Sequence, residues 1–545
     1  MGQATAPASV TPPTLRPEQN DNTGIAIPKL DGLQPPAGSE NLAITPGTVT
    51  IEGGFPELAG VTAPIAAKLQ GRRVTLAEVY AAASAIEQAY ASAGYVLVRA
   101  AVPPQQLVDG GPLRIVVVDG FIEDIDVSGL PARVRAPLLA RVARLKGRHH
   151  VKLGDIEQPL LIAGAFPGLT LTSTLARGTQ EGGARLILSG PQHLVSGSVG
   201  GDNQLASSLG TYGVNAQVSI NSAFGLGEQI YGLAVNGYDI TRMFGSAVPV
   251  RVLGGGVVIP LDEGLLTLNP EATFARTQPT VAAGTPRSRG DLRRLTMRSD
   301  YVLEKTRRHS VDISLAAEQV DETNTYLGFQ PISHDRYMAA RAGLSASASG
   351  YDGSSVATTL QLSQGLGSLG ALQLRDLPVG TTFSRQGAKL GFTKLDAAIT
   401  ARAPVMDGIV FNLVAKAQAS FGEALFRAEQ GTLEGSDAVS GLVGGITAAD
   451  STATLRGEFS RNFAGAGPLA TDLAPYVFAA GGLGRLERPT VVELAKIKAA
   501  SLGAGARFYV PRYGFGITVE YAHSFTDIPG LAQDDRVNFS TSIRF

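Results

Sequence analysis

The sequence predicts two small α+β modules of the β-α-α-β-β type, followed by a transmembrane antiparallel β-barrel of about 16 strands. Three observations lead to this fold class. Charged residues make up 17% of the chain, whereas soluble domains average about 25%. No stretch approaches the ~18 apolar residues that a membrane helix needs. Beyond Gly190, long segments alternate between apolar and polar residues, a pattern that hides a lipid-facing surface from hydropathy.

The charge balance and the lack of cysteine exclude several classes of protein. A net charge of −1 gives no reason to expect a nucleic-acid partner. Without cysteine the chain has no disulfide framework, no thiolate metal site and no cysteine nucleophile. Of the 6 histidines only His149 and His150 are adjacent, and adjacent side chains do not share a helix face. A solvated loop is therefore favoured there over a metal site.

The first 46 residues form a proline-rich segment that holds 8 of the 31 prolines. Such a segment sustains no helix and buries no core, so we predict an extended, mobile tail over residues 1–46. No charged region followed by an apolar region is present at Met1, so no signal peptide is visible. If the protein is exported, we expect the sequence to be a mature form with a new Met.

Residues 47–120 form the first predicted module, which reads β-α-β-β. A short strand at 49–51 precedes a helix opened by a capping box at Thr75 and Glu78, and Gly94 ends this helix. Two strands follow, at 95–98 and 113–118.

Residues 121–190 repeat this order with a second helix. Strands are predicted at 121–127, 169–175 and 184–188, and helices at 131–146 and 155–163. The first of these helices is basic. Its cations could attract an acidic partner or lipid headgroups, although a solvated helix face is the simpler interpretation. They are Arg133, Arg135, Arg141, Arg144, Lys146 and Arg148.

Residues 191–545 are predicted to form the barrel. Segments such as 212–221 and 515–521 alternate apolar and polar residues over about ten positions, the length of a tilted membrane strand. Residues 537–545 end the chain on an aromatic residue, as expected of a last strand that pairs with the first. We expect Val537, Phe539, Ile543 and Phe545 to lie on this closing strand, and the barrel to enclose an aqueous lumen.

The sequence offers no support for an enzyme. Residues 365–370 match G-x-G-x-x-G, but no helical pattern follows, so the glycines are interpreted as part of a barrel strand or turn. No P-loop, zinc-helix motif or nucleophile-base set is present, and we predict no cofactor, metal or catalytic residue.

Four motifs in order resemble the two-partner (type Vb) secretion transporters, the haemolysin and haemagglutinin secretion/activation proteins. Residues 118–129 resemble the joint between their two POTRA modules, and residues 158–169 resemble a stretch of their second module. Asp202-Asn203 and then residues 221–229 are similar to the signature of their first barrel hairpin. The resemblance covers roughly residues 46–545.

The resemblance implies an extracellular hairpin, around residues 425–452, that folds back into the lumen. Relatives carry V-R-G-Y at its tip, where the arginine pairs with an aspartate of F-x-D-x-G on a barrel strand. Here the tip is Val439, Ser440, Gly441 and Leu442, and the facing strand carries Phe478, Ala480 and Gly482. Ser440 and Ala480 replace the arginine and the aspartate together, so no buried charge is left without its partner. We therefore expect the hairpin to be held by packing and neutral hydrogen bonds.

Further positions follow from the same resemblance. Arg456 and Glu458 are expected on the lumen face, and of the family's G-D-x-G only Asp450 remains. Relatives also carry an N-terminal helix that plugs the pore. The proline spacing argues against such a helix here, so we expect the resting channel to be closed in a different way.

The resemblance implies export of an unfolded, β-helical partner exoprotein across the bacterial outer membrane without ATP, with the modules in the periplasm. The partner is expected to add a strand to a module sheet edge. The predicted edge strand begins with Tyr95, Val96, Leu97, Val98 and Arg99. Other expected partners are outer-membrane lipid and the barrel-assembly machinery for insertion, and a monomer is expected.

Three alternatives remain. A barrel-assembly factor of the same superfamily would open its first-to-last strand seam, but such factors usually carry more than two modules. A diffusion porin would not need about 140 residues of module. A soluble periplasmic enzyme conflicts with the ten-residue alternating strands and the missing catalytic set.

Overall fold

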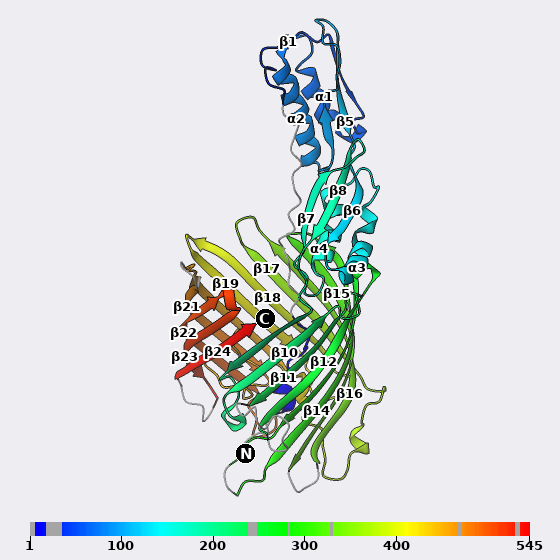
Figure 1. Ribbon diagram of the computed structural model, residues 1–545. Coiled ribbons are helices and arrows are strands. Elements are labelled where there is room, and N and C mark those ends of the chain that lie inside the picture. The colour runs from blue at the N-terminus through cyan, green and yellow to red at the C-terminus, as the bar shows by residue number, and fades with distance from the viewer. Residues whose placement is uncertain are drawn as a thin grey trace.

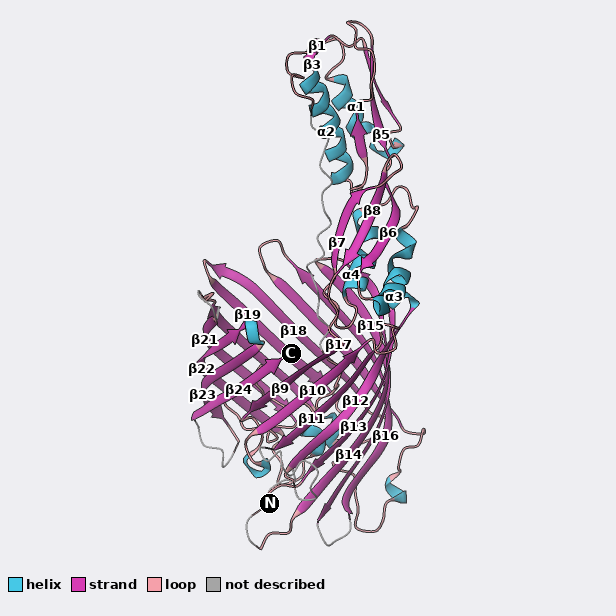
Figure 2. Ribbon diagram, viewed as in Figure 1, coloured by secondary structure: helices cyan, strands magenta, loops and turns pink. Residues whose placement is uncertain are grey.

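Two small modules stack into a stalk on one end of a large barrel (Figure 1). The computed structural model describes residues 6–17, 35–237, 248–281, 284–326, 331–465, 471–528 and 535–545. Within these ranges the α-helices all lie in the modules, and the barrel adds only short 3-10 turns (Figure 2). None of the helices described is both long and apolar enough to cross a membrane. The predicted fold class, two α+β modules and a 16-stranded barrel, is confirmed.

The first module is a three-stranded sheet covered by two helices. Strand β5 lies in the middle, parallel to β2 and antiparallel to β4, so β2 and β4 are the edges. The capping box at Thr75 and Glu78 opens α2 as predicted. The elements are β1 (Ala43–Ile44), β2 (Thr48–Glu52), η2 (Pro56–Leu58), α1 (Ala59–Ala67), β3 (Val74–Thr75), α2 (Leu76–Ser92), β4 (Arg99–Ala101) and β5 (Pro112–Val118).

The predicted strand at 95–98 is wrong. Tyr95, Leu97 and Val98 are buried, and the backbone from Gly94 to Val98 folds in turns directly after α2. The Tyr95 ring packs edge-on against Phe55, and Tyr95 and Val98 belong to the core of the first module, whereas Leu97 belongs to the core of the second. These apolar residues are therefore buried in the two cores instead of extending a sheet. The edge strand β4 therefore begins only at Arg99, and it is three residues long.

The second module repeats the architecture, with β8 in the middle of the order β6-β8-β7. Its core joins both helices to the sheet around Ile122, Leu138, Leu160 and Phe166. The exposed pair His149 and His150 lies on the connection between α3 and α4, beside Asp119. The elements are β6 (Phe121–Gly129), α3 (Ala132–Val142), η3 (Ala143–Leu145), α4 (Leu153–Gly164), β7 (Thr172–Arg177) and β8 (Gly183–Ser189).

Sixteen antiparallel strands close the barrel in sequence order, with β24 pairing back onto β9. The strands are β9 (Val195–Asp202), β10 (Gly213–Asn221), β11 (Gln229–Gly237), β12 (Val250–Leu261), β13 (Leu266–Thr277), β14 (Ser288–Lys305), β15 (His309–Tyr326), β16 (Pro331–Ser349), β17 (Ser355–Leu366), β18 (Thr393–Met406), β19 (Ile409–Ala419), β20 (Ser451–Arg461), β21 (Asp472–Arg485), β22 (Lys496–Val510), β23 (Phe515–Thr526) and β24 (Asp535–Arg544).

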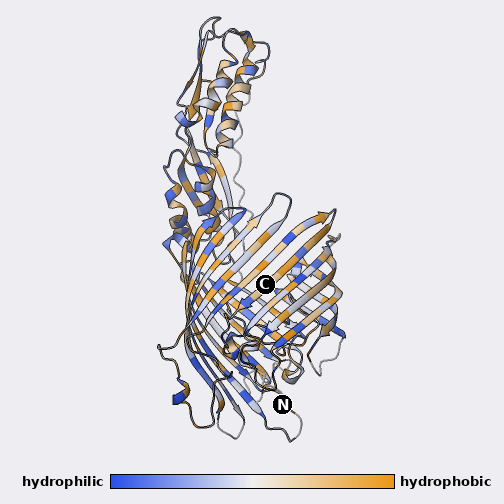
Figure 3. Ribbon diagram, turned by 180° about the vertical axis from the view of Figure 1, so that it is seen from behind, coloured by the Kyte–Doolittle hydropathy of each residue, from blue (hydrophilic) through white to orange (hydrophobic). Residues whose placement is uncertain are grey.

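Apolar and polar residues alternate along the barrel strands (Figure 3), and their exposure assigns them to the outer face or to the lumen. On β20, Leu455 and Phe459 are 54% and 49% exposed on the outside, whereas Arg456 and Glu458 are 4% and 5% exposed inside. An outward apolar band and an inward polar lining are what a barrel in a membrane requires. The motif at 365–370 spans the end of β17 and the turn after it, as predicted, and a Cβ on Gly365 would lie 2.1 Å from the Leu390 carbonyl oxygen.

The seam between β9 and β24 is short. It holds five residue pairs, from Asp202↔Ser540 to Ser198↔Arg544. The Asn203 side chain lengthens it, because its amide donates to the Val537 carbonyl (2.7 Å) and accepts from the Phe539 N–H (2.9 Å). On β24, Val537, Phe539 and Ile543 point outward, as does the terminal Phe545.

Candidate functional site

Two segments lie inside the barrel and fill much of its lumen. The first is residues 420–450 between β19 and β20, called here the inner loop. The second is residues 6–17, called here the luminal tail, whose turn η1 (Pro7–Val10) is the dark-blue segment inside the barrel in Figure 1. The two segments touch each other, because η1 contacts η8 (Arg427–Glu429) of the inner loop.

The tip of the inner loop is packed against the inside of the barrel wall. Val439, Ser440 and Leu442 are at most 5% exposed. Val439 and Leu442 join a small apolar cluster with Leu433 of the loop and with Ile497 and Ala499 of β22. Gly441 is needed for this approach, since a Cβ there would lie 2.9 Å from the Ser524 Cβ. The predicted tip residues therefore do meet the wall.

A cation from the wall binds the tip. Arg456 Nη1 of β20 donates to Ser440 Oγ (3.0 Å), and Asn538 Nδ2 donates to the Ser440 carbonyl (2.9 Å). Arg456 Nη2 also bonds Glu520 (2.6 Å), and its guanidinium lies 3.7 Å from the Phe478 ring centroid. The expectation of neutral hydrogen bonds alone is thus wrong at Ser440, because the donor is a charged guanidinium.

The register of β20 and β21 explains why Ala480 fits here. Arg456 is directly opposite Ala480, so an aspartate at 480 would lie beside the Arg456 guanidinium. Gly482 lies two positions further along the same inward face. A Cβ on Gly482 would lie 3.3 Å from side-chain atoms of Leu433 and Val439, so this glycine leaves room for the loop. The predicted facing strand is brought to the loop as expected.

Glu458 belongs to a second charged group in the lumen. Both of its carboxylate oxygens accept from Arg507, at 2.5 and 2.8 Å. Arg507 lies over the Tyr476 ring, and the Tyr476 hydroxyl donates to Glu520 (2.8 Å). The predicted lumen residues Arg456 and Glu458 therefore sit in one continuous network that leads to the loop tip.

Asp450 fixes the end of the inner loop. Its buried carboxylate accepts from the backbone N–H groups of Leu425 (3.0 Å) and Glu487 (2.7 Å) and from the Gln430 side chain (3.0 Å). Arg385 supplies the counter-charge at 3.4 Å. One aspartate thereby joins both ends of the loop to the neighbouring connection between β21 and β22.

Glu429 fixes the middle of the loop to the opposite wall. It is 2% exposed and accepts from Arg341 (2.7 Å) and from the Tyr337 hydroxyl (2.8 Å), while Lys394 lies 3.1 Å away. Glu429 and Arg341 are functional-site residues that the sequence alone did not predict. Neither carries a motif, and only the fold brings η8 to β16.

The luminal tail is bound mainly by wall side chains. The Leu15 N–H donates to Glu271 (3.0 Å), and Gln217 donates to the Leu15 carbonyl (3.0 Å). Arg294 donates to the Pro12 carbonyl (3.0 Å), and Arg16 pairs with Asp300 (2.5 Å). A proline-rich backbone makes few bonds to itself, so its carbonyls are free for such contacts.

The tail crosses the lumen lengthwise. Pro7 lies beside Gly290 at the end of β14 far from the modules, whereas Arg16 pairs with Asp300 near the other end. Extended chain rises about 3 Å per residue, enough for residues 6–17 to cross a hydrocarbon core about 30 Å thick. Within the predicted extended, mobile tail, residues 7–10 form the turn η1 and residues 11–17 are extended, with Leu15 1% exposed against the barrel wall. Residues 1–5 and 18–34 lie outside the described residues.

Arg141 joins the second module to the barrel. It is 6% exposed, donates to the Ile162 carbonyl (3.1 Å) and lies over the Phe166 ring. A Cβ on Gly227 or Gly264, in two barrel turns, would lie 3.0 or 3.1 Å from its guanidinium. Burial lowers the pKa of Arg141 to about 10. The prediction of a solvated face is therefore wrong for this residue.

The first-hairpin signature builds one of those turns. Glu228 accepts from the N–H groups of Phe224 (2.7 Å) and Leu226 (3.0 Å), which closes the turn before β11. Asn221 donates to the His193 carbonyl (3.1 Å) and accepts from Gln229 (3.0 Å), so it ties the turn to the chain entering β9. The first-hairpin signature thus shapes the barrel turn that contacts Arg141 of the second module.

Each module has an edge strand that pairs with a neighbour on one side only. In the first module β4 is an edge, and in the second β7 takes the equivalent place. Tyr95 lies before β4, and its hydroxyl donates to Glu57 (3.0 Å), a bond that raises the pKa of Tyr95. Of the predicted edge residues only Arg99 lies in a strand, where it pairs with Glu87 (2.6 Å).

Comparisons with known families match both parts of the chain. The sequence model described as haemolysin secretion/activation protein ShlB/FhaC/HecB matches residues 185–508. The model described as POTRA domain, ShlB-type, matches residues 52–120. Two curated relatives, outer membrane transporters CdiB of Escherichia coli and of its strain 536, are 28% and 27% identical over 195 residues. These alignments cover 35% of this chain and span about a third of the relatives' length, 32%.

Solved structures share the fold over nearly the whole chain. CdiB from Escherichia coli has a TM-score of 0.72 at 21% identity and covers 96% of this chain and 95% of its own. CdiB from Acinetobacter baumannii has a TM-score of 0.62 at 14% identity, with 97% and 94% covered. BamA from Haemophilus ducreyi, lacking POTRA domains 1–3, has a TM-score of 0.53 at 11% identity, with 92% and 100% covered.

Proposed function

The chain belongs to the haemolysin secretion/activation protein family, and from this premise we propose that it exports a partner exoprotein across the bacterial outer membrane through the lumen of its barrel. The single observation that carries the proposal is that the lumen is filled by two segments held by side-chain contacts. Neither segment is a strand of the wall. Both can therefore leave without breaking the barrel.

The lumen chemistry supports passage of an unfolded chain. Carboxylates and guanidinium groups alternate around it, as in the pairs Arg341–Glu429 and Arg507–Glu458. A lining of both signs offers hydrogen bonds to any peptide backbone and favours no single cargo charge. No step needs covalent chemistry, so the protein acts as a transporter and not as an enzyme.

Recognition of the partner is assigned to the module edges. Edge strands present unpaired backbone groups, and an extended peptide can add to them as a further strand. The candidates are β4, of three residues, and β7, of six. The longer β7 offers more main-chain bonds, and it lies nearer the barrel entrance (Figure 1). In this account the unfolded partner pairs in the periplasm and then enters the lumen.

The direction of transport is assigned to folding of the partner outside the cell. A chain that gains a β-helical core on the far side does not return, and no ATP is needed. We place the modules in the periplasm, the distal connections outside and the protein in the membrane as a monomer, inserted by the barrel-assembly machinery.

The test is to look for a gene for a large, repeat-rich exoprotein beside the gene for this chain and to co-express the two. Partner protein in the medium or on the cell surface supports the proposal, and it should depend on β7. Replacing Thr174 with proline disrupts the pairing of β7 with β8 and should reduce export, because the edge strand is then no longer held extended for the partner. Thr172→Ala, which keeps the backbone, is the matched control. If neither change affects export, β7 does not bind the partner.

The short seam favours a second candidate function, a barrel-assembly factor that opens between its first and last strands. Five pairs join β9 to β24, whereas twelve join β16 to β17. Cross-linking the seam through cysteines at Gly200 and Ser542, which are paired, separates the two functions. An exporter should keep working with the seam locked, and an assembly factor should stop.

A further inference from the structure

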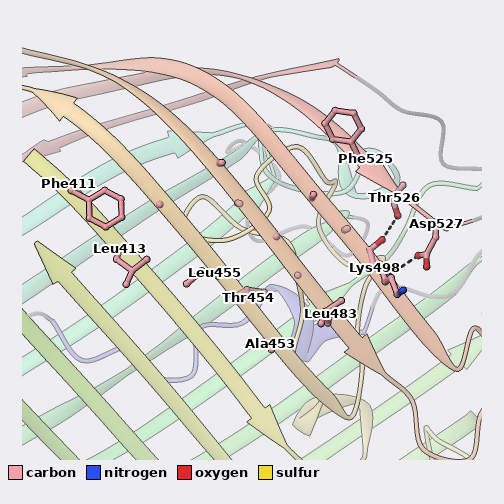
Figure 4. Close-up of a pocket in the computed structure, with 17 residues that line it drawn as sticks. Phe411, Leu413, Ala453, Thr454, Leu455, Leu483, Lys498, Phe525, Thr526 and Asp527 are labelled. Atoms are coloured by element: carbon pink, nitrogen blue, oxygen red, sulfur yellow. Dashed lines mark hydrogen bonds between the residues drawn. The ribbon is translucent and has the colours of Figure 1, made fainter.

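The outer wall of the barrel carries a wide, open hollow over β19–β23 (Figure 4). Its volume is about 940 Å³. Small residues form its floor and large apolar residues form its sides. The floor residues are Gly457, Ala479, Gly481 and Ala500, and the side residues are Phe411, Leu413, Leu455, Leu483 and Phe525.

The floor and sides belong to the outward face. Leu455 and Leu483 are 54% and 58% exposed. Gly481 pairs with Leu455 on one side and with Ala500 on the other, so these positions share one face of the sheet. The hollow therefore faces the surroundings of the barrel and not the lumen.

Lys498 lines the distal rim of the hollow, and Lys496 lies just beyond it, in a smaller adjoining hollow that both lysines line. Lys498 pairs with Leu483, and Lys496 pairs with Arg485, all on the outward face. Arg485 is neutralised by Glu487 (2.9 Å). Among the residues that the structure describes, no carboxylate lies within ion-pair distance of either lysine ammonium.

The lysine backbone is held in place at this rim. Asp527 accepts from the Lys498 N–H (2.8 Å), and the Thr526 hydroxyl donates to the Lys498 carbonyl (3.2 Å). These bonds, drawn in Figure 4, tie β22 to the end of β23 beside Phe525. The nearby carboxylate of Asp527 is thus engaged with backbone, and the ammonium groups remain available to a ligand.

We propose that this hollow binds a phosphorylated, acylated lipid of the outer leaflet, with acyl chains against the floor and a phosphate on Lys496 and Lys498. The inference rests on the membrane placement in the proposed function. In that placement the outward face meets acyl chains, and the distal rim lies at the level of lipid headgroups. Apolar surface below paired cations matches an anionic lipid, because basic residues near a membrane surface attract phosphate headgroups.

A second hollow on the same barrel provides the internal comparison. It has about 480 Å³ and lies over β14–β17, between Met297, Leu315 and Leu362. Its single cationic residue, Arg341, faces the lumen and bonds Glu429. This hollow has apolar walls but no outward cation, so it should retain neither lipid A nor the dephosphorylated lipid in detergent.

The experiment is native mass spectrometry of the full-length protein in detergent, with three probes. The first is hexa-acylated bis-phosphorylated lipid A, the second its dephosphorylated form and the third inorganic phosphate. Lys496→Ala with Lys498→Ala removes the cations. Gly481→Leu fills the floor without strain, because a Cβ there meets no atom within 4 Å. Ala340→Leu in the second hollow is the matched control.

Wild type and Ala340→Leu should retain one lipid A, and the double lysine variant should bind it about thirtyfold more weakly. Gly481→Leu should also lose bound lipid A. Neither the dephosphorylated lipid nor inorganic phosphate should displace lipid A from the wild-type protein. Equal retention by all variants, or equal binding of the dephosphorylated lipid, overturns the proposal. Heat-modifiable migration of each variant checks folding, and the assay needs no export, so its failure is distinct from failure of the proposed function.

Discussion

Ser440 shows how one residue at the loop tip changes the way the inner loop is held. Its hydroxyl accepts from Arg456, whose second partner is Glu520. The cation that binds the tip thus comes from the wall instead of the loop. With Ala480 directly opposite, the carboxylates that balance Arg456 are Glu520 at 2.6 Å and Glu458 at 3.6 Å.

Ser440→Arg should reduce partner export more than Ser440→Arg with Ala480→Asp. The single change places a second guanidinium against Arg456 in a buried site, whereas the aspartate would lie opposite Arg456 and supply the missing negative charge. We expect about a tenfold loss for the single variant and a largely restored double variant. Secreted partner per cell measures both. Equal losses in the two variants would contradict this account.

Glu429→Gln should destabilise the folded barrel. Arg341 and Lys394 would keep their positive charges in a buried site without the carboxylate between them. Breaking a buried ion pair by removing one partner costs about 3 kcal/mol. The measurement is the temperature at which the protein loses its folded migration in detergent gels. Glu423→Gln, at a partly exposed pair with Lys389, should leave that temperature unchanged.

For single residues, the sequence predicted which ones lie at the loop tip and in the lumen better than it predicted which side chains they contact. The paired loss of charge at Ser440 and Ala480 was visible by comparison with the family motifs. That Arg456 would bind Ser440 depends on the register between β20 and β21, which no local pattern encodes. Glu429 and Glu271 were missed for the same reason, since each bonds residues far away in the chain.

Among the elements, the luminal tail is the one whose removal should change the channel most. Leu15→Asp would bury a carboxylate beside Glu271, which already accepts from the Leu15 N–H. Like charges in a buried site repel, so the tail should leave the lumen. Planar-bilayer conductance should rise toward that of a variant lacking residues 1–17. Ser9→Ala, which loses a bond within the tail, should behave as wild type.

Identical conductance in wild type, Leu15→Asp and the truncated protein would mean that the tail does not limit the channel. A rise on truncation alone would show that Leu15 is not its anchor.

Arg141 of α3 connects the second module to the turns of the barrel. Arg141→Met keeps much of the bulk but loses the bond to Ile162 and the charge over Phe166. The module should then sample a wider range of angles. Because the chain has no cysteine, spin labels at introduced cysteines in place of Thr174 and Arg512 are unique, and their distance distribution should broaden. Arg133→Met, on an exposed part of α3, should not broaden it.

Elements with strong local patterns were predictable, and those set by tertiary contacts were not. The capping box and the apolar residues three or four positions apart predicted the bounds of α2 closely. The run from Tyr95 to Val98 resembled a strand because it is apolar, but Tyr95 and Val98 pack into the core of the first module and Leu97 into the core of the second. The tail's prolines indicated extended chain, yet nothing local indicates that wall carboxylates and guanidinium groups will bind it.

For the whole molecule, low charge and alternating strands were enough to predict a barrel with modules. Closure in sequence order follows from short antiparallel connections, and the polar lumen follows from the alternation. The filling of that lumen by segments from two distant parts of the chain is a property of the assembled barrel. It leaves much less open space in the lumen than the sixteen strands alone would enclose.

The most direct test of the central claim is cross-linking of a partner stalled during export. Thr296 faces the lumen and its neighbour Leu295, 50% exposed, faces outward. Single cysteines at these two positions in the otherwise cysteine-free chain report which side the partner passes. A partner halted by a stably folded domain at its end should cross-link to Thr296→Cys and not to Leu295→Cys. Cross-links only at Leu295→Cys, or surface delivery with none at Thr296→Cys, would contradict passage through the barrel.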